Sequence, residues 1–123
     1  MQKVGHKILL VDDNTMFVNR LALLLRESGN EAEIFMTATY DGALDCISKY
    51  EPDIIFLDIH LQHKSGIDLL KVIRLSGWNC KVIMLTNETK KAYKNHCEKL
   101  GSTRFLDKSY DFENIPELIK QMN

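Results

Sequence analysis

Carboxylate, hydroxyl and ammonium side chains stand at or near the ends of short apolar runs in this sequence. They are Asp12, Asp13, Asp58, Thr86 and Lys108. Carboxylates that converge repel one another, and a hard divalent cation such as Mg²⁺ relieves that repulsion. A carboxylate is also a nucleophile that can form an aspartyl phosphate. Because a hydroxyl and an ammonium can then hold the oxygens of a transferred group, the set predicts Mg²⁺-dependent phosphoryl transfer with Asp58 as the acceptor.

Each of these residues also has an ordinary explanation when it is considered alone. The acidic pair Asp12 and Asp13 can cap the helix that follows, and the hydroxyl of Thr86 can do the same. Asp58 can be a simple loop aspartate and Lys108 a solvated lysine. The conjunction of these side chains at strand ends is what favours phosphoryl transfer over unrelated structural roles.

The elements that would position these residues alternate along the chain between apolar runs and segments of helical periodicity. The expected strands are residues 8–11, 31–36, 54–57, 81–85 and 103–106. The expected helices are residues 15–28, 40–50, 66–76, 89–100 and 115–122. This alternation favours an α/β fold with a five-stranded parallel sheet, order 2-1-3-4-5, and helices on both faces. Ligands of such sheets bind beyond the carboxyl ends of the strands, where the candidate residues lie.

The composition is that of one folded domain without a polyanionic partner. The 123 residues are 45% hydrophobic and 27% charged, with a net charge of −1. A nucleic-acid-binding domain would present a basic excess, so direct binding of nucleic acid is not expected. Lys90, Lys91, Lys94 and Lys99 crowd one segment, which we interpret as the solvated face of a helix.

Cysteine usage and the absence of long apolar segments predict a cytoplasmic protein that makes no membrane contact. The three cysteines form no CxxC pair and are odd in number, which argues against a disulfide framework. Residues 1–7 lack a signal-peptide core, and no apolar run is long enough to cross a membrane. His60 and His63 lack an evident third ligand, so a transition-metal site is disfavoured.

Four motifs carry a resemblance to a known family. They are ILLVDDN at residues 8–14, DIIFLDIHL at 53–61, VIMLTNE at 82–88 and GSTRFLDKS at 101–109. Together they resemble the receiver domain of bacterial two-component response regulators, of the single-domain kind that resembles chemotaxis regulators. The resemblance implies a flavodoxin-like receiver fold over residues 1–123. It also implies a phosphorelay switch that catalyses only its own phosphorylation and dephosphorylation.

The resemblance assigns a metal and phosphate site by position. Asp58 matches the phosphoacceptor, Asp13 the direct Mg²⁺ ligand, and Asp12 an acidic neighbour that acts largely through water. The backbone carbonyl of His60 matches the main-chain metal ligand. Lys108 matches the lysine that pairs with the phosphoryl group.

The resemblance also assigns a switch. Thr86 matches the hydroxyl that turns toward the phosphoryl group, and Phe105 matches the aromatic side chain that turns inward on activation. An aromatic residue in a strand is as often plain core, so both roles remain open for Phe105. His60 and Glu88 lie two residues after Asp58 and Thr86, positions that influence how water reaches the phosphoryl group in this family.

One position departs from the family pattern, in which proline, often with a cis bond, follows the lysine. Here Ser109 follows Lys108. A cis bond before a residue other than proline costs roughly 2.5–4 kcal/mol. Either the site enforces that conformation or the loop takes another path.

The partners implied are a sensor histidine kinase or histidine phosphotransferase and a downstream protein. The readout surface is expected over residues 89–122, and whether the chain forms a homodimer there is left open. The sequence does not distinguish a stand-alone protein from one domain of a longer protein.

Three other functions share parts of this pattern. A flavodoxin-type cofactor binder would need a phosphate-binding loop after the first strand, where Asp12 and Asp13 repel phosphate. A metal-dependent phosphohydrolase would need a second carboxylate two residues after its nucleophile, where His60 stands. A receiver-like module that no longer takes phosphate is disfavoured by the complete site, although Ser109 leaves it open.

Overall fold

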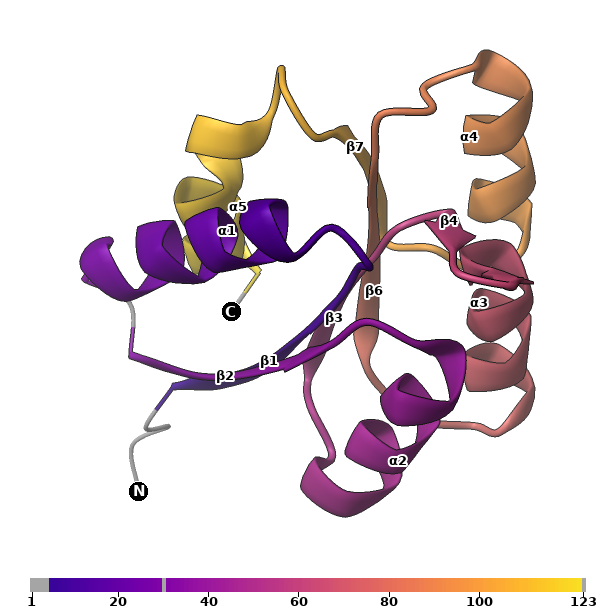
Figure 1. The fold of residues 1–123 in the computed structure, drawn as a ribbon, viewed down its shortest axis with the longest axis horizontal. Coiled ribbons are helices and arrows are strands. Elements are labelled where there is room, and N and C mark those ends of the chain that lie inside the picture. Colours follow the sequence, from indigo (N-terminus) through magenta and orange to yellow (C-terminus); the bar gives the residue numbers. More distant parts are fainter. Residues whose placement is uncertain (1–4, 30, 123) are drawn as a thin grey trace.

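A five-stranded parallel sheet forms the centre of the protein (Figure 1). The structure is a computed structural model that describes residues 5–29 and 31–122, so the outermost residues of the expected domain, 1–4 and 123, lie outside the described part. The strands are β1 (His6–Val11), β2 (Ala32–Thr37), β3 (Ile54–Leu57), β6 (Lys81–Thr86) and β7 (Arg104–Asp107). Their order is β2-β1-β3-β6-β7, which confirms the order expected from the sequence.

Helices cover both faces of this sheet. They are α1 (Thr15–Glu27), α2 (Tyr40–Tyr50), α3 (Gly66–Leu75), α4 (Lys91–Lys99) and α5 (Ile115–Gln121), with a 3₁₀ turn, η1 (Phe112–Asn114), before α5. α1 and α5 lie on one side of the sheet, whereas α2, α3 and α4 lie on the other (Figure 1). Within the described residues, no helix combines the length and the apolar character that a membrane crossing requires.

The central strands β1 and β3 are buried on both faces, which explains their unbroken apolar runs. Along β1, Leu9 and Val11 pack in the cluster beneath α2 and α3, while Ile8 and Leu10 pack in the cluster beneath α1 and α5. Alternate side chains of a strand point to opposite faces, so a strand covered on both sides needs apolar residues at every position.

Local signals place most helix ends where the sequence predicts them. The side chain of Asn14 accepts a hydrogen bond from the backbone N–H of Phe17 (3.1 Å) and caps α1, and Gly29 lies just after that helix with φ +81°. α4 begins at Lys91, two residues later than expected, and no side chain caps it. Because Lys90 cannot cap the helix with its side chain, the sequence contained no local signal for the start of α4.

A short hairpin between β3 and α3 was not expected from the sequence. β4 (His60–Leu61) and β5 (Lys64–Ser65) pair antiparallel, and His63 in the turn adopts a positive φ of 65°. Strands of two residues are too short to show a period of two, so no pattern announced them. The hairpin matters because it connects Asp58 directly to the start of α3.

Candidate functional site

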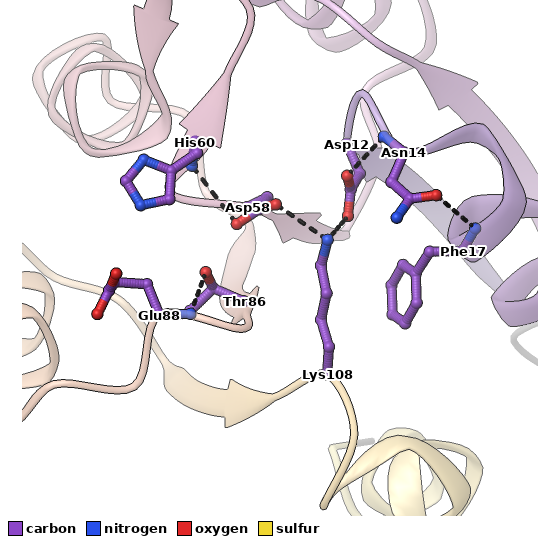
Figure 2. Close-up of polar contacts among 8 residues, drawn as sticks. All are labelled: Asp12, Asn14, Phe17, Asp58, His60, Thr86, Glu88 and Lys108. Atoms are coloured by element: carbon purple, nitrogen blue, oxygen red, sulfur yellow. Dashed lines mark hydrogen bonds and ion pairs between the residues drawn. The ribbon is translucent and has the colours of Figure 1, made fainter.

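Asp12, Asp58 and Lys108 meet at the carboxyl edge of the sheet (Figure 2). The Nζ of Lys108 lies 2.6 Å from Oδ2 of Asp12 and 3.0 Å from Oδ2 of Asp58. Each of the three side chains belongs to a residue that is only 7% exposed. One buried ammonium therefore bridges two buried carboxylates that come from different strands.

The strand register brings these residues level with one another. Val11 pairs with Leu57, so Asp12 and Asp58 both follow directly, and the Asp58 N–H donates to the carbonyl of Val11 (3.1 Å). On the other side of β6, the Lys108 N–H donates to the carbonyl of Thr86 (3.0 Å). The parallel pairing thus places the functional side chains along one edge, as the expected strand order requires.

Burial and pairing act in opposite directions on the charges of this cluster. The pKa of Asp12 is raised, chiefly by burial and also by the charge of Asp58, although hydrogen bonds from Lys108 and the Asn14 N–H act to lower it. Burial by itself lowers the pKa of Lys108, but the hydrogen bonds and charges of Asp12 and Asp58 outweigh it and leave that pKa raised. Lys108 is therefore held as a cation, and it supplies the fixed positive charge of the site.

Thr86 and Glu88 lie on the side of Asp58 that is away from Asp12 (Figure 2). Thr86 is 1% exposed, and its Oγ1 accepts a hydrogen bond from the backbone N–H of Glu88 (3.1 Å). The hydroxyl hydrogen is not used in that contact, so Thr86 keeps its donor capacity. Phe105 pairs with Met84 across the sheet and is half-buried against the cluster on the α4 side, together with Tyr93 and Leu100.

Of the expected metal ligands, the carboxylates of Asp12 and Asp58 lie together beside Lys108. Asp13 is exposed, and the His60 side chain is exposed as well, while the His60 N–H lies 3.4 Å from Oδ1 of Asp58. Over residues 5–29 and 31–122, no three or more His, Cys, Asp or Glu side chains are grouped as a metal site. Mg²⁺ usually binds through one or two carboxylates, waters and phosphate oxygens. The neighbouring carboxylates of Asp12 and Asp58, both held by Lys108, fit that requirement.

The loop after Lys108 takes a path that differs from the family pattern. No cis peptide bond occurs in the described part of the chain, so the Lys108–Ser109 bond is trans. The N–H groups of Ser109 and Tyr110 donate to Oδ1 of Asp107 (2.7 and 3.0 Å), and the Asp107 N–H donates to Oδ2 of Asp111 (2.8 Å). A proline at position 109 could not donate the first of these bonds. Serine therefore supports a differently bonded loop that still delivers Lys108 to the site.

Two residues of the site carry roles that sequence reasoning missed. A Cβ built on Gly66, the first residue of α3, would collide with the backbone carbonyl of Asp58, so only glycine lets the helix approach the acceptor. Phe17 lies in the helix expected over residues 15–28 and was assigned no role in the site, yet the Nζ of Lys108 lies 4.7 Å from the centre of its ring. The glycine at a helix start was a visible signal, but nothing local indicated the contact of Phe17.

A family model described as the response regulator receiver domain matches residues 8–120. The chain belongs to this family. The resemblance read from the four motifs is thereby confirmed. Receiver domains are signalling domains of two-component systems, and they act through phosphorylation between a histidine kinase and a downstream effector.

The chain is similar to curated proteins of different lengths. It is 28% identical over 120 residues to the sporulation initiation phosphotransferase F of Bacillus subtilis, covering 96% of this chain and 94% of that protein. It is 27% identical over 115 residues to the sensory transduction protein LytT of the same organism, covering 94% of this chain. The match spans 47% of LytT, about half the length of that relative.

Solved structures show the same fold. A response regulator from Burkholderia pseudomallei with a phosphorylated aspartic acid, a calcium ion and citrate superposes with a TM-score of 0.82 at 24% identity. The similar region covers 93% of this chain and 66% of that one. The flavodoxin-like receiver architecture expected from the sequence is therefore confirmed.

Proposed function

We propose that this receiver domain is a signalling switch that accepts a phosphoryl group on Asp58. The observation that carries the proposal is the buried Lys108 ammonium, held between the carboxylates of Asp58 and Asp12. A fixed cation beside a nucleophilic carboxylate stabilises the charge that develops on a transferred phosphoryl group. The donor is a sensor histidine kinase, a histidine phosphotransferase or a small phosphodonor.

In the proposed reaction, an oxygen of Asp58 forms a bond to phosphorus while the bond from phosphorus to the donor atom breaks. Lys108 stays beside the oxygens of the transferred group, and the Thr86 hydroxyl donates to one of them. Asp12, Asp13, Asp58 and the backbone carbonyl of His60 would hold Mg²⁺, which neutralises charge on those oxygens when it is bound.

Loss of the phosphoryl group is the reverse half of the switch. Water attacks phosphorus, and the bond to the Asp58 oxygen breaks, which restores the carboxylate. His60 is exposed beside Asp58 and Glu88 is half-buried beside Thr86, so both border the approach of water. We assign these two side chains to tuning of the phosphate lifetime.

The signal leaves through residues 89–122, which include α4, β7 and α5. Phosphorylation shifts the population toward a state in which the Thr86 hydroxyl moves to the phosphoryl group and Phe105 turns inward. The half-buried position of Phe105 beside α4 leaves room for that change in exposure. The receiver is proposed to occupy residues 1–123 and to act on a downstream protein or a second copy of itself.

The test is the intact mass of the protein after incubation with acetyl phosphate and Mg²⁺. One phosphoryl adduct is expected in the native protein, and none in Asp58→Asn or after chelation of Mg²⁺. An adduct that survives in Asp58→Asn would place the acceptor elsewhere. No adduct in the native protein, together with an unchanged amide spectrum on addition of beryllofluoride, would favour the phosphate-independent interaction module.

A further inference from the structure

We propose that Phe17 is a positioning residue for Lys108, and that the face of its ring seats the ammonium by a cation–π contact. This inference rests on the proposed phosphoryl transfer at Asp58. The Nζ of Lys108 lies 4.7 Å from the centre of the Phe17 ring, well inside the reach of about 6 Å for such contacts. Phe17 is 9% exposed and Lys108 is 7% exposed, so both partners of the contact are largely buried.

The ring is itself held from its other side. Phe112, in η1, packs edge-on against Phe17 with the ring centres 5.8 Å apart and the planes at 63°. The guanidinium carbon of Arg20 lies 4.8 Å from the centre of the Phe112 ring. Two cations, Lys108 and Arg20, therefore enclose two aromatic rings that come from α1 and from the segment before α5. This stack fixes the orientation of the Phe17 ring toward the lysine.

The contact matters because Lys108 borders an open cleft. The cleft has a volume of about 690 Å³ and is lined by Lys108, Phe17 and Phe112, among other residues of α1 and of the loop after β7. A lysine ammonium sits on a flexible stem and is strongly hydrated, so it can swing into such a space. When an oxygen of Asp58 forms its bond to phosphorus, one of the two carboxylate contacts changes. The ring keeps attracting the ammonium without consuming a carboxylate oxygen.

A purely structural role for Phe17 makes a different prediction. Phe17 also belongs to the apolar cluster beneath α1 and α5, where an aliphatic side chain of similar size could fill the same space. Only an aromatic face provides the negative quadrupole that attracts a cation. The effect of replacing Phe17 should therefore follow the electronics of its ring rather than its volume.

The first experiment measures the position of Lys108 in the full chain without Mg²⁺ or phosphodonor. An amine-reactive ester is added, and the labelling rate of Lys108 is followed by peptide mass spectrometry. We expect Phe17→Leu to raise this rate about 3- to 30-fold and Phe17→Tyr to restore it. Phe35→Leu is the matched control, because Phe35 is a half-buried aromatic residue that stacks on Tyr50 in the other cluster. Equal labelling in Phe17→Leu and Phe17→Tyr would overturn the inference.

The second experiment keeps the shape of the ring and is informative even if Phe17→Leu folds poorly. Phenylalanines with one, two and three ring fluorines are placed at position 17, and the rates of Lys108 labelling and of phosphorylation by acetyl phosphate are measured. With each fluorine the labelling rate should rise and the phosphorylation rate should fall. A flat series would refute the cation–π contact. Absence of an adduct in the unmodified protein would instead refute the proposed phosphorylation, while the labelling series would still test Phe17.

Discussion

An aspartate makes short polar contacts at each end of the central strands β1 and β3, but the two aspartates are held in different ways. At the amino end, Asp53 Oδ2 lies 2.8 Å from Nδ1 of His6, and its Oδ1 accepts the backbone N–H of Lys7 (2.8 Å). The backbone of Asp53 also donates to the Lys7 carbonyl and accepts from the Lys81 N–H (both 2.9 Å). Asp53 therefore joins three neighbouring strands.

At the carboxyl end, Asp58 is bound mainly by a side chain from another loop. Its Oδ2 contacts the Lys108 ammonium at 3.0 Å, while its Oδ1 has a long contact of 3.4 Å to the His60 N–H. The Asp53 carboxylate is held by a histidine ring and a backbone N–H of strand β1, and the backbone of Asp53 is bonded to β1 and β6, so its contacts stabilise the fold. The Asp58 carboxylate instead has one close contact, to the Lys108 ammonium, and it is proposed to stay available as a nucleophile. Asp53 and Asp58 therefore differ in the groups that hold their carboxylates, and not in their own chemistry.

Replacing the ammonium should produce the largest effect. Lys108→Met removes the fixed cation and is expected to lower the initial rate of phosphorylation by acetyl phosphate by about 10²–10³-fold, the usual loss for one stabilising group. The rate is measured from intact mass against time at saturating Mg²⁺. A rate within a factor of three of the native one would show that Lys108 is not the charge that stabilises the reaction.

Asp53→Asn, at the other end of the sheet, should lower the stability of the protein and leave phosphorylation unchanged. It weakens the contacts to His6 and Lys7 and is expected to reduce the free energy of unfolding by about 1–3 kcal/mol, while the phosphorylation rate of the folded protein stays native. Urea unfolding and the mass assay measure the two quantities on one sample. A large loss of phosphorylation without a loss of stability would remove the proposed distinction between the two ends.

Gly66→Ala tests whether the close packing of α3 against Asp58 is needed for phosphorylation. The added Cβ meets the carbonyl of Asp58, so we expect a loss of about 1–3 kcal/mol in unfolding free energy together with slower phosphorylation. Gly77→Ala is the control, because its Cβ meets open space and only the backbone at φ +77° is strained. Unaltered phosphorylation in Gly66→Ala would mean that α3 can shift without moving Asp58.

The smallest effects are expected from the side chains that border the phosphoryl group. His60→Ala and Glu88→Ala should each change the decay rate of the phosphorylated protein by about fivefold, which corresponds to roughly 1 kcal/mol in the barrier. The decay is followed by intact mass after the phosphodonor is removed. Native decay rates in both variants would exclude a role in phosphate lifetime.

Much of the fold was predictable because its signals are local. The apolar run of β1 and the helical periodicity of α1 each depend on residues close together in the chain, and both match the structure. The β4–β5 hairpin was missed because strands of two residues have no periodicity. The late start of α4 was missed because Lys90 provides no side-chain cap.

Some features of the site were likewise predictable from the sequence, and others were not. By itself, the sequence determined which side chains end the strands, because strand burial requires apolar runs and Asp12, Asp58 and Thr86 stand where those runs stop. Only the tertiary structure decided that Lys108 bridges two carboxylates, that the loop at Ser109 is bonded through Asp107, and that Phe17 lies beside the ammonium. The contacts of Lys108 join residues far apart in the chain, so they depend on strand register and side-chain direction, which no short sequence pattern encodes. The bond between Ser109 and Asp107 is local, but it depends on the conformation of a loop that the position of Lys108 in the fold sets.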